Sequence, residues 1–461
     1  MMIRFGLSLL VAACCGVHGC AQWECVGGGF QLGGVFDIKY DSAFGRLFVA
    51  GSMHNMVTDS VLVKGVAVWD QSGWRPLGKG VTQYGGSPPK ALMITDTALI
   101  VAGGFQEMDS VPNTQWAAQW KGDAWHSMGI TSGTTGSCSA LRLDTLGGEL
   151  HLFGPCQFGT SPAMSNWLTW DGGEWRQYDS DEPFDGYTAA ACRYQGQVHV
   201  AGNFWTVNGA TDVARYTGST WEELGPGVAG DPFMTDMLVY DDLLWVCGDI
   251  AASAGNPANA LLAWDGAQWL DPFPQITHVA YGRDLLVANG KLYYTGTFVA
   301  NGLDSAYALL EYDGQQVCVM GGSGPVLGRI AASADTLYAA TGEHLFGFMS
   351  GPLMNFIGKW PLNAPRDTCF ALPQSMGGGS DRPLFWSAAP NPNQGQFTLR
   401  GPGLNDLREL EAVDALGRSV WVEWSHVEAG SVEVRCAGTG LITLRGRTAD
   451  RRGQARVLVE P

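Results

Sequence analysis

Charge, and positive charge above all, is scarce in this 461-residue sequence. Only 15% of the residues are charged, and 27 lysines and arginines stand against 44 aspartates and glutamates, a net charge of −17. The whole imbalance lies in residues 1–380, with 17 basic and 34 acidic residues. Nucleic acids and anionic lipids are bound largely through lysine and arginine, so we expect neither as a partner.

Long apolar runs are also missing after the N-terminus. The opening segment, MMIRFGLSLLVAACCGVHGCAQ, has one arginine, an apolar run and then small residues, which predicts a signal peptide over residues 1–21 with cleavage after Ala21. LVAAC at 10–14 resembles the lipobox of bacterial lipoproteins, so lipoprotein processing stays open as the alternative. No other apolar stretch reaches the roughly 18 residues of a spanning helix, so we expect no transmembrane segment in the mature chain.

Residues suited to metal binding or catalysis are few and scattered. The sequence has 8 histidines and no CxxC pair, which argues against a zinc site. It contains no GxSxG, no HExxH, no Walker loop and no GxGxxG placed between a strand and a helix. We therefore predict no metal, no cofactor and no catalytic residues.

Cysteine is the exception among the reactive residues. Three of the 11 cysteines fall in the predicted signal peptide, and the eight that remain suggest disulfides in an exported protein. Cys138 and Cys156 lie symmetrically about a turn at Gly147, so a hairpin places them opposite each other. We predict that these two form a disulfide.

Tryptophan and glycine are abundant, and their pattern repeats. RYTGSTWEELG at 215–225 has an aromatic residue, a short glycine-containing turn and a tryptophan, and variants of it recur roughly every 44 to 51 residues. A glycine that ends an apolar run precedes each copy and keeps the same period. The first aromatics are Trp69, Trp120, Trp170, Tyr216, Trp264, Tyr312 and Phe356, and the glycines are Gly51, Gly103, Gly154, Gly202, Gly248, Gly296 and Gly342.

Each repeat unit has the pattern of four short β-strands. Apolar and aromatic runs of four to six residues are separated by Gly, Asp and Asn turns, which is the hairpin signature. Four strands in a unit of this length are typical of a β-propeller blade, so we predict an all-β fold with a seven-bladed β-propeller over residues 22–369. The tryptophans then fill the space between blades, because a ligand site needs one special place rather than seven equivalent ones.

The repeat resembles extracellular kelch-like propeller repeats of the WDGxxW type. VAGNFWTVNGATDVARYTGSTWEELGPGV, at 200–228, matches best, and the resemblance extends over about residues 23–362. It implies an architecture and says almost nothing about activity, because such propellers carry many functions.

The chain changes character after the repeats. Residues 370–386 include LPQSMGGGSDRP and are predicted to be a flexible linker. Residues 387–461 alternate in short apolar strands and are predicted to form a small β-sandwich. This region resembles the C-terminal sorting domain of the type IX secretion system of Bacteroidetes. The matching sorting-motif positions are Pro390, Asn391, Pro392, Gly395, Asp414, Gly417, Arg418 and Gly440.

That resemblance implies a route for the protein. The signal peptide leads to the periplasm, and the type IX translocon is the implied partner that carries the propeller to the cell surface or the medium. We therefore expect a secreted or surface-displayed binding or adhesion protein, with an unidentified glycan or protein ligand on the face of the variable loops between second and third strands. A secreted glycan-active hydrolase or lyase built on the propeller is the alternative.

Trp205 is the candidate ligand-binding residue in these loops, because it breaks the repeat pattern. Phe105, Phe204 and Phe298 recur at one repeat position, and we interpret them as residues that cap the ends of the blades.

The N-terminus is predicted to close the ring. WECVGGGF at 23–30 matches WRPLGKGV at 74–81, so the strand around Cys25 completes the last blade beside the strand around Phe356. Exposed sheet edges are thereby avoided. A second disulfide, Cys25–Cys369, would lock this closure.

Overall fold

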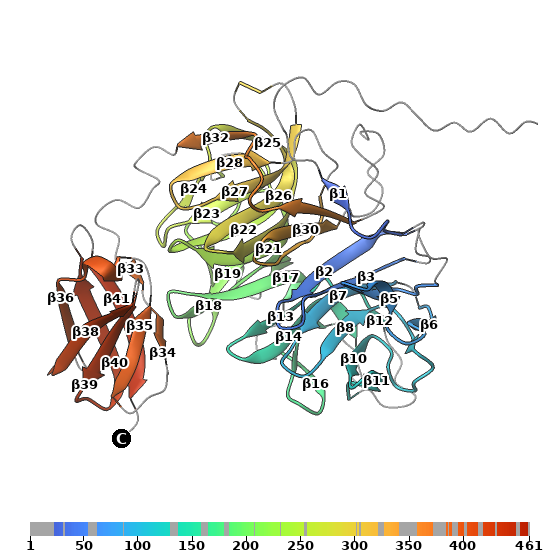
Figure 1. Cartoon of the computed structure of the whole chain (residues 1–461), viewed down its shortest axis with the longest axis horizontal. Helices are drawn as coiled ribbons and strands as arrows, with labels where there is room; N and C mark the ends of the chain where they lie inside the picture. Colours follow the sequence, from blue (N-terminus) through green and yellow to red (C-terminus); the bar gives the residue numbers. More distant parts are fainter. Residues whose placement is uncertain are drawn as a thin grey trace, which may run out of the picture. The chain divides into compact units, whose positions relative to one another are not determined.

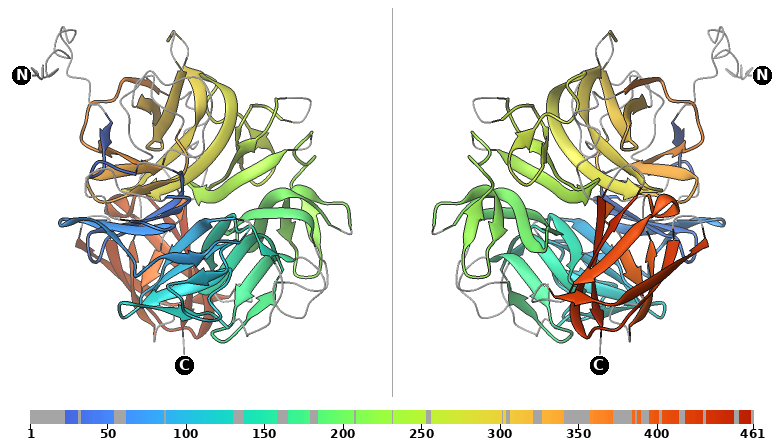
Figure 2. Two further views of the ribbon diagram at one scale, coloured as in Figure 1. Left: turned by 90° about the vertical axis from the view of Figure 1, so that its right-hand side faces the viewer. Right: turned by 90° about the vertical axis from the view of Figure 1, so that its left-hand side faces the viewer.

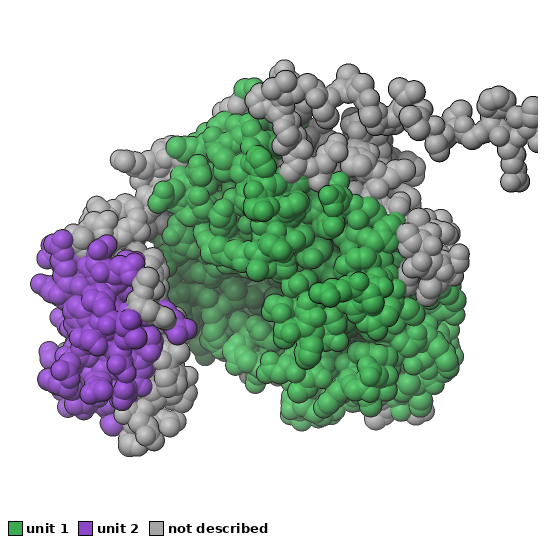
Figure 3. Space-filling view, viewed as in Figure 1, with its two compact units in different colours: residues 1–371 green, residues 372–461 purple. Residues whose placement is uncertain are grey.

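The computed structural model describes residues 23–459 with gaps. The residues left out within this span are 31–32, 54–61, 86, 130–136, 158–164, 179–183, 207, 231, 253–255, 301, 304–305, 321–326, 341–356, 372–383, 386, 390–394, 401–402, 414–417, 429–430 and 449–451. The chain divides between Ala371 and Leu372 into two compact units (Figure 3).

Seven antiparallel sheets of four or five strands account for most of the described first unit. Sheet 1 contains β2 (Val35–Asp41), β3 (Arg46–Gly51), β4 (Val66–Asp70) and β5 (Gly73–Pro76). Sheet 2 contains β7 (Pro89–Ile94), β8 (Leu99–Gly103), β10 (Ala117–Lys121) and β11 (Ala124–Ser127). Sheet 3 contains β12 (Ser137–Cys138), β13 (Arg142–Leu146), β14 (Glu149–Gln157), β15 (Ser165–Trp170) and β16 (Trp175–Gln177).

The remaining sheets of this unit follow in chain order. Sheet 4 contains β17 (Asp185–Tyr194), β18 (Gln197–Trp205), β19 (Thr211–Tyr216) and β20 (Trp221–Glu223). Sheet 5 contains β21 (Phe233–Tyr240), β22 (Leu243–Asp249), β23 (Leu261–Trp264) and β24 (Trp269–Leu270). Sheet 6 contains β25 (Ile276–Ala288), β26 (Lys291–Ala300), β27 (Ala306–Tyr312), β28 (Gln316–Met320) and β32 (Thr368–Ala371). Sheet 7 contains β29 (Ile330–Ala332), β30 (Thr336–Ala340), β31 (Ile357–Pro361) and β1 (Glu24–Cys25), and a separate pair joins β6 (Val81–Gln83) to β9 (Glu107–Met108).

The sheets follow one another in a closed circle (Figures 1 and 2). The inner strands contact each other in the order β2, β7, β13, β17, β21, β25, β29, and β29 contacts β2 again. Hydrophobic clusters fill the spaces between consecutive sheets; one of them joins sheets 4 and 5 through Ala201, Val213, Leu244 and Val246. Four-stranded antiparallel sheets packed in a circle form a β-propeller.

The ring closes with a strand from the N-terminus, as predicted. β1 pairs with β31, placing Cys25 opposite Gly358 and Glu24 opposite Lys359. The backbone N–H of Val26 donates to the carbonyl of Ile357 over 3.2 Å. Sheet 7 thus takes three strands from one end of the repeat region and its outer strand from the other.

The repeated aromatics face each other across the outer hairpins, as expected. Trp69 lies opposite Trp74 with ring centroids 5.5 Å apart, and equivalent pairs lie 5.2–5.4 Å apart. These pairs are Trp120–Trp125, Trp170–Trp175, Tyr216–Trp221 and Trp264–Trp269. Such tilted ring pairs add to the energy of burial.

The assignment of Phe356 as the seventh aromatic is wrong. Trp360 lies opposite Leu337, just as Trp69 lies opposite Leu47, so Trp360 holds the repeat position. Its partner ring is Trp23, with centroids 5.5 Å apart. Because the second aromatic comes from β1, Trp360 is not followed by the glycine-containing turn and tryptophan of the other repeats, and the motif was therefore matched four residues too early.

The aspartates after the first aromatics make the turns, as expected. The Asp171 carboxylate accepts the backbone N–H groups of Gly173 and Glu174, and Asp265 and Asp313 bond their own turns in the same way. Such bonds let a short polar side chain fix a tight turn.

Two disulfides join cysteines in the described part of the first unit. Cys138 on β12 faces Cys156 on β14 and is bonded to it, which is the predicted pair. The predicted Cys25–Cys369 pair is wrong, because the chain returns from sheet 7 to sheet 6 as β32. There Cys369 lies opposite Cys318 and is bonded to it, whereas Cys25 lies in sheet 7 opposite Gly358.

The second unit contains two sheets. One has the order β33 (Leu384–Phe385), β41 (Arg452–Val459), β40 (Gly440–Arg447), β36 (Glu409–Val413), β37 (Ser419–Val420), with β33 parallel to β41. The other has the order β34 (Ser387–Ala389), β35 (Gln396–Arg400), β39 (Ser431–Cys436), β38 (Val422–Glu428), and a 3-10 turn, η1, spans Leu404–Asp406. One cluster takes residues from both sheets, including Phe397, Val432, Ile442 and Leu444. β32 and β33 take residues from both ends of the segment interpreted as a linker.

Candidate functional site

Five charged residues occupy the same position on or directly before the inner strands of five sheets. We call Asp37, Arg142, Asp236, Asp284 and Arg329 the axial cluster. Asp37, Arg142, Asp236 and Asp284 each pair with the residue just before the repeated glycine of the second strand, and Arg329 accepts the backbone N–H of Ala340 at the matching place. In sheets 2 and 4 this position holds Ala91 and Ala190. Sequence analysis missed the cluster.

Each of the three aspartates joins its own sheet to the following one: sheet 1 to sheet 2, sheet 5 to sheet 6, and sheet 6 to sheet 7. Oδ2 of Asp37 accepts the backbone N–H of Leu92 over 2.6 Å, and Oδ2 of Asp236 accepts that of Leu285 over 2.9 Å. Oδ2 of Asp284 accepts the N–H of Ile330 over 2.8 Å. Each carboxylate thus accepts a backbone N–H group from the innermost strand of the following sheet, at an edge where no other described strand is paired.

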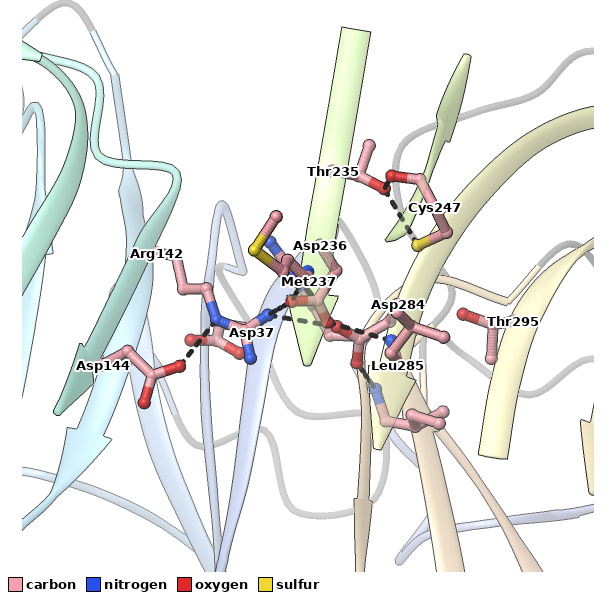
Figure 4. A network of polar contacts seen from close by, with 12 residues as sticks. Asp37, Arg142, Asp144, Thr235, Asp236, Met237, Cys247, Asp284, Leu285 and Thr295 are labelled. Carbon is pink, nitrogen blue, oxygen red and sulfur yellow. Dashed lines mark hydrogen bonds and ion pairs between the residues drawn. The ribbon is translucent and has the colours of Figure 1, made fainter. Parts of the chain in front are cut away.

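The two arginines bridge sheets that are not neighbours, and Figure 4 shows the contacts of Arg142. Nη1 of Arg142, on sheet 3, lies 2.5 Å from Oδ1 of Asp236 on sheet 5 and 3.7 Å from Oδ1 of Asp284 on sheet 6. Arg329, before sheet 7, lies 2.6 Å from Asp284 and donates to the carbonyl of Leu141 on sheet 3 over 3.3 Å. The cluster therefore ties opposite sides of the ring together.

Burial and neighbouring charges together shift the pKa values of Arg142 and Asp236. Burial alone lowers the pKa of Arg142, but the carboxylates of Asp236, Asp144 and Asp284 outweigh it, and the pKa lies well above its ordinary value. Burial raises the pKa of Asp236, and the attraction of Arg142 only partly opposes this. Three carboxylates stabilise the charged form of Arg142, whereas the charge of Asp284 repels that of Asp236. Since the carboxylates are engaged by backbone and guanidinium groups, the arrangement is suited to crosslinking the ring.

A second group of residues is exposed at one end of sheets 4 and 5. β17 and β18 are among the longest strands, and their paired ends place Trp205 opposite Asp185 and Tyr187 opposite Asn203. Directly opposed residues share a face of a sheet. Trp205 is 53% exposed and Tyr187 43%, whereas Phe204, on the other face, is fully buried. The predicted ligand residue thus lies on a solvent-facing extension of the hairpin.

Sheet 5 continues this exposed face. Phe233, 37% exposed, holds the position of Tyr187 in the next sheet and lies opposite the exposed Asp249. The rings of Tyr187 and Phe233 are 6.3 Å apart, and Nδ2 of Asn203 donates to the carbonyl of Pro232 over 3.0 Å. We call Trp205, Tyr187 and Phe233 the aromatic surface; Tyr187 and Phe233 were not predicted.

The other predicted residues are placed as follows. Phe105, Phe204 and Phe298, which were expected to cap blade ends rather than to bind a ligand, are fully buried. Of the sorting-motif positions, Gly395 has φ +87° and accepts the N–H of Cys436, Gly440 begins β40, and Arg418 is exposed before β37. Pro390, Asn391, Pro392, Asp414 and Gly417 lie outside the described residues, as does the predicted signal peptide.

Metal ligands and membrane helices were sought in the described part of the chain. There, no three His, Cys, Asp or Glu side chains are grouped so that they could hold a metal ion. Within the same residues, no helix combines the length and the hydrophobicity that crossing a membrane requires.

Comparisons with known proteins show distant similarity in structure alone. No protein-family model matches the chain, and no curated protein matches it either. A computationally designed protein, Ika8, is similar over 74% of this chain and 100% of its own, with 11% identity and a TM-score of 0.41. An acylaminoacyl peptidase of Pyrococcus horikoshii has 11% identity and a TM-score of 0.35, covering 67% of this chain and 49% of its own. A PQQ-bound aldose sugar dehydrogenase of Streptomyces coelicolor has 12% identity and a TM-score of 0.30, covering 74% of this chain and 98% of its own.

Proposed function

We propose that this chain is a secreted or cell-surface binding protein whose propeller holds a ligand at the aromatic surface. The observation that carries the proposal is the exposure of Trp205, Tyr187 and Phe233 side by side on two sheets. Large apolar side chains grouped on a protein surface are unfavourable for solubility. Where a rigid scaffold nevertheless exposes such a group, it commonly marks an interaction site. The ring provides rigidity, because the axial cluster and the closing strand tie its sheets together.

We also infer the finer architecture. The seven sheets are seven blades, since the inner strands form one cycle that returns to its start. The second unit is a small β-sandwich, since one apolar cluster takes residues from both of its sheets. Its proposed role is that of a type IX sorting domain, and the propeller is the cargo.

Binding without turnover is the expected behaviour of the purified full chain. Incubation with a panel of polysaccharides should give retention on at least one of them and no release of reducing ends or unsaturated products. The reason is that the buried carboxylates of the axial cluster are already engaged by backbone N–H and guanidinium groups. Turnover that disappears on replacing one carboxylate would show instead that the propeller is a glycan-active hydrolase or lyase.

Truncation tests the proposed export route. A chain that ends at Ser380 retains every strand of the first unit and the Cys318–Cys369 disulfide, so we expect it to fold. In a host with a type IX system, it should accumulate in the periplasm while the full chain reaches the surface or the medium. Fractionation and surface protease treatment measure this. Equal surface delivery of both chains would rule out the sorting role of residues 387–461.

A further inference from the structure

The aromatic surface has a chemical composition that restricts its ligand. Each of its rings lies directly opposite a polar residue: Trp205 opposite Asp185, Tyr187 opposite Asn203, and Phe233 opposite Asp249. Directly opposed residues of an antiparallel pair have Cβ atoms only about 4.5–5.5 Å apart. A ligand lying on these rings therefore meets hydrogen-bonding groups at its edges.

The shape of the surface is open. Trp205, Tyr187 and Phe233 are between 37% and 53% exposed, and they come from the ends of two adjacent hairpins. Trp205 lies diagonal to Tyr187 on the same sheet face, at a separation that large side chains span. Tyr187 in turn contacts Phe233 on the next sheet, with ring centroids 6.3 Å apart. The rings form an extended platform, which suits an elongated ligand with flat apolar faces better than a single enclosed cation.

The charge of the surface is of one sign. The two charged residues directly opposite its rings, Asp185 and Asp249, are both exposed carboxylates, and residues 1–380 carry 34 acidic against 17 basic residues. Carboxylates accept hydrogen bonds from hydroxyl groups and attract amines, and they repel uronates, sulfates and phosphates. Charge complementarity therefore disfavours an acidic ligand.

We infer that the aromatic surface binds glycans without acidic groups, that is, chains of neutral or amino sugars. Such sugars present apolar C–H faces that lie on aromatic rings, and hydroxyl groups at the ring edge that donate to carboxylates and the Asn203 side-chain carbonyl. This inference rests on the proposed binding function and adds the class of ligand and the residues that select it.

The test uses the full chain on a glycan array that contains neutral, amino-sugar and acidic glycans. Cellohexaose, chitohexaose, its deacetylated form and oligogalacturonate are then titrated by calorimetry. The variants are Trp205→Ala, Asp185→Asn and a control, Trp421→Ala, which removes the exposed tryptophan of the second unit. A parallel titration with a lysine-rich peptide tests a cationic protein partner.

We expect binding to at least one non-acidic glycan, reduced at least tenfold by Trp205→Ala and unchanged by Trp421→Ala. A tenfold loss corresponds to about 1.4 kcal/mol of binding free energy. Both tryptophan variants should unfold at the temperature of the parent chain, since the two side chains are largely exposed. Asp185→Asn should weaken the binding of the deacetylated glycan more than that of cellohexaose.

The other outcomes overturn the inference in distinguishable ways. Preference for oligogalacturonate would contradict the charge argument. Binding of the lysine-rich peptide alone, lost in Trp205→Ala, would refute the glycan class and leave the proposed binding function standing. Absence of any Trp205-dependent binding in both titrations and on the array would refute the aromatic surface as a ligand site, and with it the proposed function.

Discussion

Replacing Arg142 with alanine should lower the free energy of unfolding by about 3–5 kcal/mol, the usual cost of breaking a buried ion pair from one side. Arg142 lies within 2.5–3.7 Å of carboxylate oxygens of Asp144, Asp236 and Asp284. Among the described residues, its removal leaves Arg329 as the remaining cationic partner of Asp236 and Asp284, both of which are buried. The same substitution also removes the link between sheet 3 and sheets 5 and 6.

The loss should depend on pH in a defined direction. Burial raises the pKa of Asp236 in the folded protein. A raised carboxyl pKa means that the folded state prefers the protonated form of Asp236. Protonation of Asp236 therefore stabilises the fold fully below the pKa of an unfolded aspartate, about 3.9, and this stabilisation is lost as pH rises through the pKa of the folded state. Without Arg142 the pKa rises further. The deficit of the variant relative to the parent should therefore be largest near neutral pH and shrink toward pH 4.

Urea unfolding of Arg142→Ala and the parent across this pH range is the measurement. Arg176→Ala is the matched control, since Arg176 also belongs to sheet 3 and pairs with Asp171 and Glu174 but is 62% exposed. An exposed pair of this kind contributes little to stability, because water screens the attraction between its charges. Equal losses in the two variants, or a deficit that grows on acidification, would contradict the role assigned to the axial cluster.

Deleting residues 22–29 should open the ring and lower the unfolding temperature by many degrees. The deletion removes β1 and Trp23, which is buried against Trp360. It also removes the Val26 carbonyl, which accepts the indole N–H of Trp74 over 2.8 Å. Loss of a buried tryptophan alone costs about 3–5 kcal/mol, and the deletion also exposes the edge of β31.

Differential scanning calorimetry of three chains measures this effect. A chain lacking only residues 1–21 serves as the reference, and Trp23→Ala keeps the closing strand while removing its ring. We expect the order of stability to be reference, then Trp23→Ala, then the deletion. If the deletion unfolds at the temperature of the reference, β1 does not hold the ring closed.

The features that could be predicted from the sequence are those that recur from repeat to repeat. Aromatic pairs, Asp turns and four-strand units recur, so each copy strengthens the assignment of the others. The match between 23–30 and 74–81 allowed β1 to be predicted in the same way. Cys138 and Cys156 were predictable because they flank one hairpin turn. Trp205 was found as a departure from the repeat.

The features that escaped prediction do not repeat. The axial position holds Asp, Ala, Arg, Ala, Asp, Asp and Arg in sheets 1 to 7, so comparison of repeats treats it as variable. Its meaning appears only when the ring brings distant strands to one place. β32 pairs outside the repeat, which concealed the Cys318–Cys369 bond. Tyr187 and Phe233 lie at strand ends, where the alternation of a buried strand gives no sign of exposure.

The Cys318–Cys369 bond also determines how mechanical force passes through the propeller. Tension applied to the chain beyond Ala371 enters at Cys369 and crosses the sulfur bridge to Cys318 on sheet 6. β29, β30 and β31, which hold the N-terminal strand, all lie within the 51-residue interval that this bridge closes. They are therefore shielded from the pull. The non-covalent pairing between β1 and β31 is therefore not loaded by this force. A propeller that is held by its C-terminal end can withstand a pulling force without separation of β1 from β31.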